Sequence, residues 1–579
     1  MFVVATAGHV DHGKSTLVRA LTGMEPDRWA EERRRGMTID LGFAWTTLDS
    51  GATVAFVDVP GHERFVPNML AGIGPVPAAM IVVAADEGWM PQSAEHLAAL
   101  HALDVRHGLL VVTRSDLADP GPALRDATER IAGSALGAVE AVTVSGRTGA
   151  GLPELRAALR RLTDRLPRPV IDEPVRLWID RSFTIKGAGT VVTGTLGGGT
   201  LTRGDELELV GTKVRIRGLQ TLGSPADRVE AVARVAVNLR GTDRGAITRG
   251  TALLTPGRFR HTDLIDVRVH GDPVTGLPAT IMLHIGSAAA PVRVRPLGPD
   301  TARLRLSRPL PLRIGDRALI RDPGRRHVAG GVTILDVAPP PLTRRGAASA
   351  RAEELAGMDG AADPVAELRR RRLISRAELA GMGVPADAIA PVAGEWLADP
   401  EHWAALRRRL VEEVGSYAAE QPLEPGAPLE ALRHRLDLPD RALVEALIGP
   451  PLISRSGRVT RGAAEIPEML IKAVNQAFAG AEPFTAPETN RLTQLGLGPR
   501  QIAAAARAGL LIRLADTVVL PPEAPSRAAE ILSRLPQPFT MSEAKNALRT
   551  TRRVAVPLLE ILDREGITRR LPDDRRETT

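Results

Sequence analysis

A glycine-rich segment near the N-terminus has the residue types and the spacing that bind nucleotide phosphates. The sequence "FVVATAGHVDHGKSTL" covers residues 2–17, and Gly8 to Ser15 fits the pattern G-x-x-x-x-G-K-[ST]. Glycines let the backbone wrap closely, so that successive N–H groups point at phosphate oxygens, and a following helix adds its N-terminal dipole. A chance glycine turn is the alternative, but the pattern lies between a strand-like run and a helix-like segment. We therefore expect phosphate contacts from Gly8, His9, Val10, Asp11, His12, Gly13, Lys14, Ser15 and Thr16, with Lys14 on the β- and γ-phosphates.

Two further segments supply groups for magnesium binding and hydrolysis. Asp58 and Gly61 lie in "FVDVPGHERF", where the carboxylate is expected to hold Mg²⁺ through water and the Gly61 N–H to bond the γ-phosphate. His62 comes next, in a position to orient the attacking water, with a surface histidine as the alternative. Thr38 in "RRRGMTID" adds a hydroxyl that completes the magnesium shell only while the γ-phosphate is present. The expected metal ligands are Ser15, Thr38 and Asp58, and the expected catalytic residues are Lys14, Thr38, Gly61 and His62.

The base of the nucleotide is expected to be read at "VVTRSD". An aspartate at a strand end accepts hydrogen bonds from N1–H and the exocyclic amine of guanine, so Asp116 predicts GTP rather than ATP. The usual pattern is Asn-Lys-x-Asp, whereas this chain has Thr113 and Arg114 at the first two positions. Arg114 can still lie flat over the base, but Thr113 cannot reproduce every bond of an asparagine. Ser145 and Gly146 in "VSGRTG" are predicted to form the final base-contacting loop.

Length and composition indicate a cytoplasmic protein of several domains. The chain has 579 residues, 44% hydrophobic and 25% charged, which is ordinary for globular domains of ~150 residues each. The net charge of +7 and the pI near 10.4 admit a nucleic-acid partner. The absence of cysteine excludes disulfides, thiolate metal sites and cysteine nucleophiles. No apolar run approaches the ~20 residues of a membrane span, and the N-terminal run is too short for a signal peptide, so we expect no membrane contact.

Three sequence textures follow one another and predict α/β, all-β and helical domains. Residues 1–168 alternate strand runs such as "AAMIVVAAD" with helical patterns such as "QSAEHLAALHAL", which predicts a parallel sheet covered by helices. Short β-rich runs between glycine and proline turns predict two or more small β-barrels, at 174–257 and 258–342. Residues 347–579 repeat roughly every 55–60 residues as helices closed by a β-hairpin, which predicts about four tandem winged helices, the last near 524–579. The predicted fold class is a P-loop GTPase domain followed by β-barrels and C-terminal winged helices.

Four motifs give the chain a family resemblance. The sequences "GHVDHGKSTL", "RGMTIDLGF", "DVPGHERFVPNMLAGIG" and "VVAADEGWMPQSAEHL" resemble those of the translational GTPases, in which Asp11 and His12 of the phosphate loop are typical. Within that group, "DVPGHERF" followed by "NMLAG" is most similar to the selenocysteine-specific elongation factors. The resemblance covers the whole chain, because two barrels similar to those of elongation factor Tu are followed by a winged-helix extension that elongation factor Tu lacks.

The resemblance implies an amino-acid pocket in the first barrel. In the family, an Asp-Arg pair and an arginine from a later strand line this pocket, and Asp180, Arg181 and Arg234 occupy the matching positions. A selenol is more acidic than a thiol, so selenocysteine is anionic at neutral pH. Guanidinium groups in a partly dry pocket favour that anion over neutral serine or cysteine. An ion pair of Asp180 and Arg181 at a strand end is the alternative interpretation.

The last winged helix is expected to bind RNA. Arg552 and Arg553 open a predicted recognition helix, and Arg569 and Arg570 fall in or near the predicted wing. A helix and a wing can clasp a nucleic-acid backbone with exposed bases. The resemblance implies that the target is an mRNA stem-loop. A solvated charged surface is the alternative, since acidic residues are interspersed among these arginines.

These observations lead to the hypothesis of a GTP hydrolase that carries selenocysteyl-tRNA to the ribosome at UGA codons while tethered to an mRNA stem-loop. The expected cofactors are GTP or GDP and Mg²⁺. The expected partners are selenocysteyl-tRNA, the mRNA stem-loop and the ribosome, and we expect a monomer. Two alternatives stay open: another GTPase similar to elongation factor Tu, such as the GTPase subunit of a sulfate-activating enzyme, and a winged-helix nucleic-acid regulator with a GTPase switch. Arg181, Arg234 and the winged-helix arm argue against the sulfate-activating enzyme.

Overall fold

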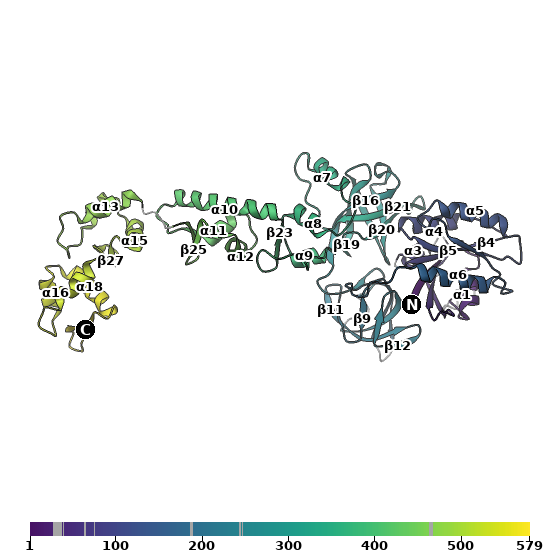
Figure 1. The fold of residues 1–579 in the computed structure, drawn as a ribbon, viewed down its shortest axis with the longest axis horizontal. Coiled ribbons are helices and arrows are strands. Elements are labelled where there is room, and N and C mark those ends of the chain that lie inside the picture. Colours follow the sequence, from purple (N-terminus) through teal and green to yellow (C-terminus); the bar gives the residue numbers. More distant parts are fainter. Residues whose placement is uncertain are drawn as a thin grey trace. The chain divides into compact units, whose positions relative to one another are not determined.

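The chain forms two compact units in the computed structural model, whose elements are labelled in Figure 1. The structure describes residues 1–26, 38, 40–62, 65–74, 76–185, 189–241, 245, 247–462 and 467–579. The first unit comprises Met1–Arg370 and Ile374–Ile389, and the second comprises Arg371–Leu373 and Ala390–Thr579. Among the helices so described, none is both long enough and apolar enough to span a bilayer.

The N-terminal domain is built on a six-stranded sheet with the order β2-β3-β1-β4-β5-β6, in which only the β2–β3 pair is antiparallel. Its strands are rich in valine, alanine and isoleucine, and every residue of β4 is buried, as expected for parallel strands covered on both faces. The elements are β1 (Phe2–Ala7), α1 (Lys14–Thr22), β2 (Gly42–Thr47), β3 (Thr53–Asp58), α3 (Val66–Ile73), β4 (Ala78–Ala84), α4 (Pro91–Ala102), β5 (His107–Thr113), α5 (Gly121–Ala132), β6 (Glu140–Thr143) and α6 (Leu152–Arg165).

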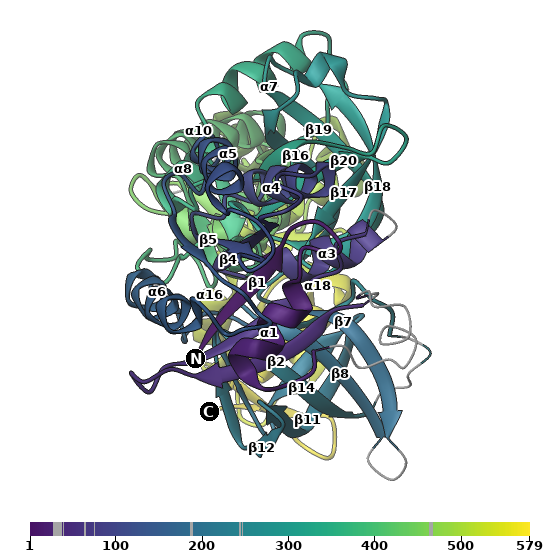
Figure 2. The same cartoon turned by 90° about the vertical axis from the view of Figure 1, so that its right-hand side faces the viewer.

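Helices cover both faces of this sheet (Figure 1 and Figure 2). Helices α1 and α6 pack on one face through a core that includes Leu17, Phe56 and Leu159. Helices α3, α4 and α5 pack on the other face through a second core that includes Leu100 and Ile131. The parallel strands therefore end along one edge of the sheet, where the loops that follow them lie together.

Two β-barrels follow. Six strands of the first barrel form a ring, because β10 pairs with both β15 and β11 at the ends of the order β10-β15-β7-β8-β14-β11. Its strands are β7 (Arg176–Ile185), β8 (Gly189–Leu196), β9 (Thr200–Thr202), β10 (Glu206–Leu209), β11 (Thr212–Thr221), β12 (Ser224–Ala226), β13 (Arg228–Glu230), β14 (Ala233–Arg240) and β15 (Ala252–Leu254). The alternation of buried and partly exposed residues along β14 places its valines and Leu239 in the barrel core.

The second barrel is closed, with the order β16-β19-β18-β17-β20-β21. Its strands are β16 (Arg260–Gly271), β17 (Thr280–Ile285), β18 (Ala288–Pro296), β19 (Thr301–Leu312), β20 (Arg317–Asp322) and β21 (His327–Asp336), with a 3₁₀ turn at Val274–Gly276. This barrel packs directly on α4: a Cβ atom at Gly331 would collide with the Ala102 carbonyl. Arg321 Nη2 also lies 3.0 Å from Glu95 Oε1 of α4.

The sequence predicts a helical arm that starts at residue 347, but the structure joins the first helices of that region to the barrels. Residues 347–370 and 374–389 belong to the first unit. Helix α7 (Ala347–Ala356) is attached by a buried ion network in which Arg351 bonds Asp266 at 2.8 Å and Asp336 at 2.6 Å, and residues 374–389 are attached by contacts such as the Ile314 N–H, which donates to the Met382 carbonyl at 2.9 Å. Arg303 also bonds Asp266, at 2.7 Å. Burial by itself lowers the pKa of Arg351, but the carboxylates outweigh that effect and raise it.

In the residues that the structure describes, the second unit contains three helical groups that each end in a β-hairpin. The connecting region holds α8 (Pro364–Arg371), β22 (Leu373–Ser375), α9 (Arg376–Gly381) and β23 (Trp396–Ala398). The three groups are α10 (Pro400–Glu420), β24 (Ala427–Pro428), α11 (Leu429–Arg435), α12 (Arg441–Leu447), β25 (Leu452–Arg455) and β26 (Arg458–Arg461); α13 (Glu468–Phe478), α14 (Thr489–Gln494), α15 (Pro499–Arg507), β27 (Ile512–Ala515) and β28 (Val518–Leu520); and α16 (Ala524–Leu532), α17 (Met541–Ala547), α18 (Arg552–Arg564), β29 (Thr568–Arg570) and β30 (Arg576–Thr578).

The last two helical groups share one apolar core. Phe484, Val518 and Leu520 of the middle group pack with Phe539 and Leu559 of the last group. The first group has a separate core around α10, α11 and α12. Each helix–hairpin group thus packs mainly on itself and on its neighbour, as in other repeat architectures.

The buried network around Arg351 leads to a prediction about the anchoring of α7. Arg351→Met keeps a long side chain but leaves Asp336 without its buried guanidinium partner, so the opening of α7 should become easier by about 3–5 kcal/mol. Hydrogen exchange of the α7 amides measures this change. Arg345→Met, at an exposed position in the preceding loop, is the control and should exchange like the parent. Unchanged exchange in Arg351→Met would show that the network does not hold the helix.

Candidate functional site

The predicted phosphate loop connects β1 to α1 with two glycines in conformations that other residues rarely adopt. Gly8 has φ 141° and Gly13 has φ 77°. Lys14, the first residue of α1, curls back over the loop. Its Nζ donates to the Gly8 carbonyl at 3.1 Å and to the His9 carbonyl at 2.6 Å. The ammonium group is therefore held against the phosphate loop, as expected for a lysine that binds phosphate oxygens.

Two buried histidines stabilise the loop: His12 lies within it, and His96 lies on α4. His96 of α4 accepts a hydrogen bond through Nδ1 from the Gly8 N–H at 3.0 Å. His12 Nδ1 lies 3.2 Å from the Val82 carbonyl, and its Nε2 lies 3.6 Å from Glu87 Oε2. Burial lowers the pKa of His96 to about 3 and that of His12 to about 4, so both rings are neutral near pH 7.

The three predicted magnesium ligands lie together. Ser15 Oγ donates to Asp58 Oδ2 at 2.6 Å and lies 3.0 Å from Thr38 Oγ1, while Thr6 donates to the other Asp58 oxygen at 2.7 Å. Asp58 is fully buried, and burial raises its pKa, whereas Lys14 and the two hydroxyl donors lower it. Hydroxyl and carboxylate oxygens are the ligands that Mg²⁺ prefers. These residues therefore fit a magnesium ion beside the phosphate loop.

Gly61 lies against the phosphate loop. A Cβ atom at this position would come within 2.6 Å of the Val10 nitrogen and 2.5 Å of Lys14 Nζ, so only glycine brings its backbone so close to the loop. The predicted catalytic residue His62 follows immediately and is partly buried, with its ring centroid 5.9 Å from that of Phe65. The backbone just before His62 therefore packs directly against the phosphate loop.

The predicted base-reading segment is tied to the phosphate loop by its threonine. Thr113, at the end of β5, is buried and donates through Oγ1 to the His12 carbonyl at 2.8 Å. The hydroxyl of Thr113, which stands where the usual motif has asparagine, thus links the base-reading segment to the phosphate loop.

The arginine of this segment is held by acids from the loop after β4. Arg114 has φ 57°, and its Nη1 lies 2.8 Å from both Asp86 Oδ2 and Glu87 Oε1. Its Nη2 donates to the Asp11 carbonyl. Glu87 contacts His12 as well, so one carboxylate joins the base-reading segment to the phosphate loop. The predicted stacking of Arg114 over a base stays a prediction.

The remaining predicted base contacts lie at the same edge of the sheet. Asp116 is exposed, and the Ser115 N–H just before it donates to the Val144 carbonyl at 3.2 Å. Ser145 is buried and accepts from the Thr148 N–H at 3.1 Å. A Cβ atom at Gly146 would lie 3.3 Å from the Thr16 methyl group. The last loop therefore borders the start of α1, where a base bound beside the phosphate loop would lie.

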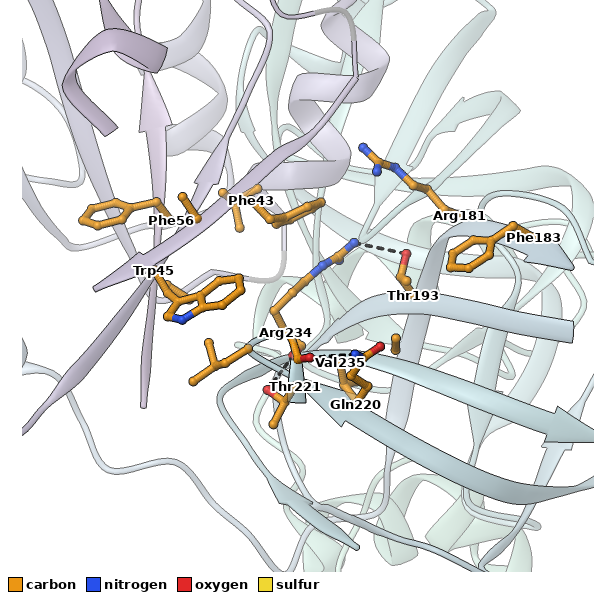
Figure 3. Close-up of a pocket in the computed structure, with 16 residues that line it drawn as sticks. Phe43, Trp45, Phe56, Arg181, Phe183, Thr193, Gln220, Thr221, Arg234 and Val235 are labelled. Atoms are coloured by element: carbon orange, nitrogen blue, oxygen red, sulfur yellow. Dashed lines mark hydrogen bonds between the residues drawn. The ribbon is translucent and has the colours of Figure 1, made fainter. Parts of the chain in front are cut away.

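A second site lies between the N-terminal domain and the first barrel. It is a cavity of about 290 Å³ with Phe43 and Trp45 of β2 on one side and Arg181 and Arg234 on the other (Figure 3). Because aromatic side chains line the N-terminal domain side and guanidinium groups the barrel side, the cavity suits a small anion or a ligand with an anionic group.

Arg234 is fixed within the barrel. Its guanidinium forms a two-pronged ion pair with Asp180, in which Nη2 donates to Oδ1 at 2.8 Å, and Nη2 also lies 3.2 Å from Thr193 Oγ1. Thr193 in turn donates to Asp180 at 2.7 Å. The guanidinium carbon lies 3.8 Å from the ring centroid of Phe43, a close cation–π contact, and Figure 3 shows the side chain extended beneath that ring. Asp180 thus positions Arg234 and does not itself line the cavity, although the family resemblance implied that it would.

Arg181 is held from the opposite side, by the N-terminal domain. Its Nε lies 2.8 Å from Asp40 Oδ2, and its Nη2 donates to the Leu41 carbonyl. The guanidinium lies 5.6 Å from the Phe43 ring. The carboxylate beside Arg234 therefore belongs to the barrel, and the carboxylate beside Arg181 belongs to the N-terminal domain.

Several of these functional contacts were not predicted from the sequence. Asp40 and Phe43 lie in the quoted motif "RGMTIDLGF", but the residue pattern there predicts nothing more specific than a strand. The residues that this segment contacts in the first barrel are about 140–190 positions away in the chain. His96 lies in a predicted helix and has no sequence signal of its own beyond its motif. Only the tertiary contacts reveal their roles.

The predicted RNA-binding arginines lie on α18 and in the hairpin that follows it. Helix α18 begins at Arg552, and both Arg552 and Arg553 are exposed. Arg553 Nη2 donates to Thr517 Oγ1 of the middle helical group at 2.9 Å. In the part of the chain that the structure describes, neither arginine has a carboxylate within ion-pair distance.

The wing arginines are paired. Arg569 Nε donates to Glu577 at 3.0 Å, and Arg570 Nε donates to Asp574 at 2.9 Å. Positive charge without a neutralising acid is therefore concentrated at the first turn of α18, where the helix dipole adds to it.

Family models match three parts of the chain. The model described as "Elongation factor Tu GTP binding domain" matches residues 1–165. The model described as "Selenocysteine-specific elongation factor, beta-barrel domain" matches residues 267–341, and "Elongation factor SelB, winged helix" matches residues 530–576.

Whole-length relatives carry the same description. The selenocysteine-specific elongation factor of Escherichia coli (strain K12) is 33% identical over 99% of this chain and 98% of its own length. That of Desulfomicrobium baculatum is 30% identical over 99% of both chains. Elongation factor Tu 2 of Streptomyces avermitilis is 32% identical but covers 58% of this chain. A solved bacterial selenocysteine-specific elongation factor, EF-Sec, aligns over 100% of this chain and 99% of its own with a TM-score of 0.76 at 24% identity, which shows the same fold.

The buried histidines His12 and His96 lead to a prediction about how stability depends on pH. Unfolding lets each ring regain its usual pKa of 6.5, so the unfolded chain takes up protons below that pH while the folded chain does not until about pH 4 for His12 and pH 3 for His96. Above pH 6.5, the contribution of these rings to the free energy of unfolding should not change with pH. From pH 6.5 toward pH 4, the free energy of unfolding should fall by about 1.4 kcal/mol per histidine for each pH unit.

Hydrogen exchange of the β1 and β4 amides between pH 7 and pH 5, corrected for intrinsic rates, measures this slope. His96→Asn removes one of the two titrating groups, so it should reduce the slope by about 1.4 kcal/mol per pH unit. His101→Asn, at an exposed position on the same helix, should leave the slope unchanged. Equal slopes in all three proteins would contradict the assignment.

Proposed function

The chain belongs to the selenocysteine-specific elongation factors, and from this premise we propose that it delivers selenocysteyl-tRNA to the ribosome at UGA codons while its C-terminal winged helices hold an mRNA stem-loop. It is a translational GTPase, which binds guanine nucleotide and hydrolyses GTP. The family match over nearly the whole chain decides against a sulfate-activating GTPase. The observation that carries the proposal is the pair of guanidinium groups, Arg181 and Arg234, on one cavity at the first barrel.

The cavity is suited to a selenolate for electrostatic reasons. A selenocysteine side chain is anionic at neutral pH, whereas serine and cysteine are neutral, so a charge-assisted contact with a guanidinium group discriminates among them. The Phe43 ring excludes water from one side of Arg234, and a contact between charges gains strength where water is excluded. Asp180 and Thr193 hold the Arg234 guanidinium in one orientation, so the binding group is preorganised.

The nucleotide site supports GTP hydrolysis with separate roles for its residues. Lys14 and the loop N–H groups would bind phosphate oxygens, and Ser15, Thr38 and Asp58 would hold Mg²⁺, which shields the charge that develops on the phosphates. Gly61 brings its backbone to the mouth of the loop, and His62 is proposed to orient the attacking water. Asp116 is proposed to accept from N1–H and the amine of guanine.

The arm is proposed to act as the tether. The exposed first turn of α18 presents Arg552 and Arg553 together with the positive end of the helix dipole, which attracts phosphates. Because the last two helical groups share a core, α18 and the preceding wing at Thr517 form one surface. An RNA stem-loop offers both backbone phosphates and unpaired bases to such a surface.

The cavity arginines give the test of the cargo assignment. Arg181→Ala and Arg234→Ala should each weaken the binding of selenocysteyl-tRNA by the loss of one charge-assisted bond, about 1.5–3 kcal/mol, and weaken that of seryl-tRNA much less. Competition binding of the two tRNAs to the GTP-bound protein measures the difference. Arg203→Ala, at an exposed position of the same barrel, is the matched control and should bind both tRNAs like the parent. Equal losses for the two tRNAs would make the cavity arginines structural and reject the pocket.

The arm is tested with an RNA hairpin that the full-length protein itself enriches from a randomised pool. The double substitution of Arg552 and Arg553 to alanine should weaken binding and make its dependence on salt shallower, by roughly 0.7–0.9 in the log–log slope for each phosphate that the variant no longer neutralises. Arg527→Ala, an exposed arginine of α16 in the same helical group, is the control. Parental affinity and slope in the double variant would place the RNA-binding surface elsewhere.

A further inference from the structure

Two carboxylates, Asp86 and Glu87, lie in the turn that follows β4, beside the base-reading segment. The Ala85 N–H donates to the Thr113 carbonyl at 2.9 Å, so the turn is tied to the end of β5. Both carboxylates are only partly exposed. Neither is among the groups that are expected to bind phosphate, magnesium or the base, so their position calls for another explanation.

Both carboxylates hold the guanidinium of Arg114. Its Nη1 donates to Asp86 Oδ2 and to Glu87 Oε1, each at 2.8 Å, and its Nη2 donates to the Asp11 carbonyl of the phosphate loop. Burial by itself lowers the pKa of Arg114, but Glu87 and Asp86 outweigh that effect and raise it. The backbone of Arg114 has φ 57°, a left-handed conformation that arginine rarely adopts, so its surroundings fix the main chain as well as the side chain.

Glu87 also contacts the phosphate loop itself. Its Oε2 lies 3.6 Å from Nε2 of His12, whose ring is buried. The carbonyl of His12 accepts from Thr113, the residue before Arg114, at 2.8 Å. Glu87, His12, Thr113 and Arg114 therefore form a closed ring of contacts that joins the turn after β4, the phosphate loop and the base-reading segment.

An arginine at this position needs more partners than the lysine of the usual Asn-Lys-x-Asp motif. An ammonium group has three donors that rotate freely, whereas a guanidinium group has five donors in one plane. A single carbonyl, such as that of Asp11, leaves the orientation of this plane open. Two carboxylates on a turn that is tied to β5 fix the orientation, because they accept from a second nitrogen of the same group.

We propose that Glu87 is a positioning residue for the guanine nucleotide, which acts by holding the guanidinium of Arg114 in one orientation. With that group fixed, the aliphatic stem of Arg114 presents one flat face to the base. The proposal rests on the function proposed above, in which Asp116 reads that base. A side chain that is ordered before binding loses less conformational entropy when the base arrives, so Glu87 tightens nucleotide binding without touching the nucleotide.

The affinity of the full-length protein for GDP tests this role, measured by competition against GDP with a fluorescent label on its ribose. Glu87→Ala removes the carboxylate and should weaken GDP binding roughly tenfold. Glu87→Gln keeps an acceptor oxygen but loses the charge, so it should weaken binding by only about threefold. Glu129→Ala, at an exposed position of α5, is the control and should bind GDP like the parent.

A double-mutant cycle distinguishes this role from simple support of the phosphate loop. In the Arg114→Ala background, Glu87 has no guanidinium to hold, so Glu87→Ala should weaken GDP binding by less than about twofold further. If Glu87 only supports His12, the same loss appears in both backgrounds, and the proposal is overturned. Unchanged affinity in Glu87→Ala also overturns it, as does tighter binding, which would mean that the carboxylates draw the arginine away from the base.

A separate variant tests the base-reading role on which the proposal rests. Asp116→Asn should shift the preference from GDP toward xanthosine diphosphate, because the amide can donate to the additional carbonyl of xanthine. If that variant keeps the parental preference for GDP, Asp116 does not read the base. If the preference shifts but the effects of Glu87→Ala and Arg114→Ala are additive, the base-reading role is supported and the positioning role of Glu87 is rejected.

Discussion

A buried carboxylate, Asp58, joins the parts of the nucleotide site. Its two oxygens accept from Thr6 and Ser15, and the Thr6 oxygen in turn accepts from the Val59 N–H, so the end of β3 is fixed to β1 and to the start of α1. A carboxylate without solvent is costly unless it is hydrogen-bonded and close to a cation. The hydroxyl donors, Lys14 and the expected magnesium ion meet that requirement. The chain that continues from Asp58 then brings Gly61 to the phosphate loop, and Thr38 contacts the same Ser15 hydroxyl.

The second site, the cavity at the first barrel, also depends on the pairing of buried charges. Arg181 and Arg234 line one cavity, yet each guanidinium is partly neutralised, one by its own barrel and one by the N-terminal domain. Phe43 lies against both cations and shields Arg234 from water. These carboxylates reduce the positive potential that the two guanidinium groups present to the cavity.

Buried ion networks also decide where the domains end. The Arg351 network with Asp266 and Asp336 adds α7 to the second barrel, although its sequence texture is that of the helical arm. Beyond residue 389, the helical groups end in small hairpins, and the last two groups share a core, while Leu423 of the first group packs against the core of the middle group.

The sequence by itself determined the local parts of this protein: the phosphate loop, the order of the α/β, β-barrel and helical regions, the family, and the first turn of α18 at Arg552. These features depend on contiguous residues, whose spacing and hydrophobic period follow from backbone geometry. Only the tertiary structure revealed that His96 caps the Gly8 N–H, that Thr113 bonds the phosphate loop, that Asp180 lies behind Arg234, and that Asp40 faces Arg181. Those contacts join residues far apart in the chain, and their energies depend on burial and on the charges that folding brings together.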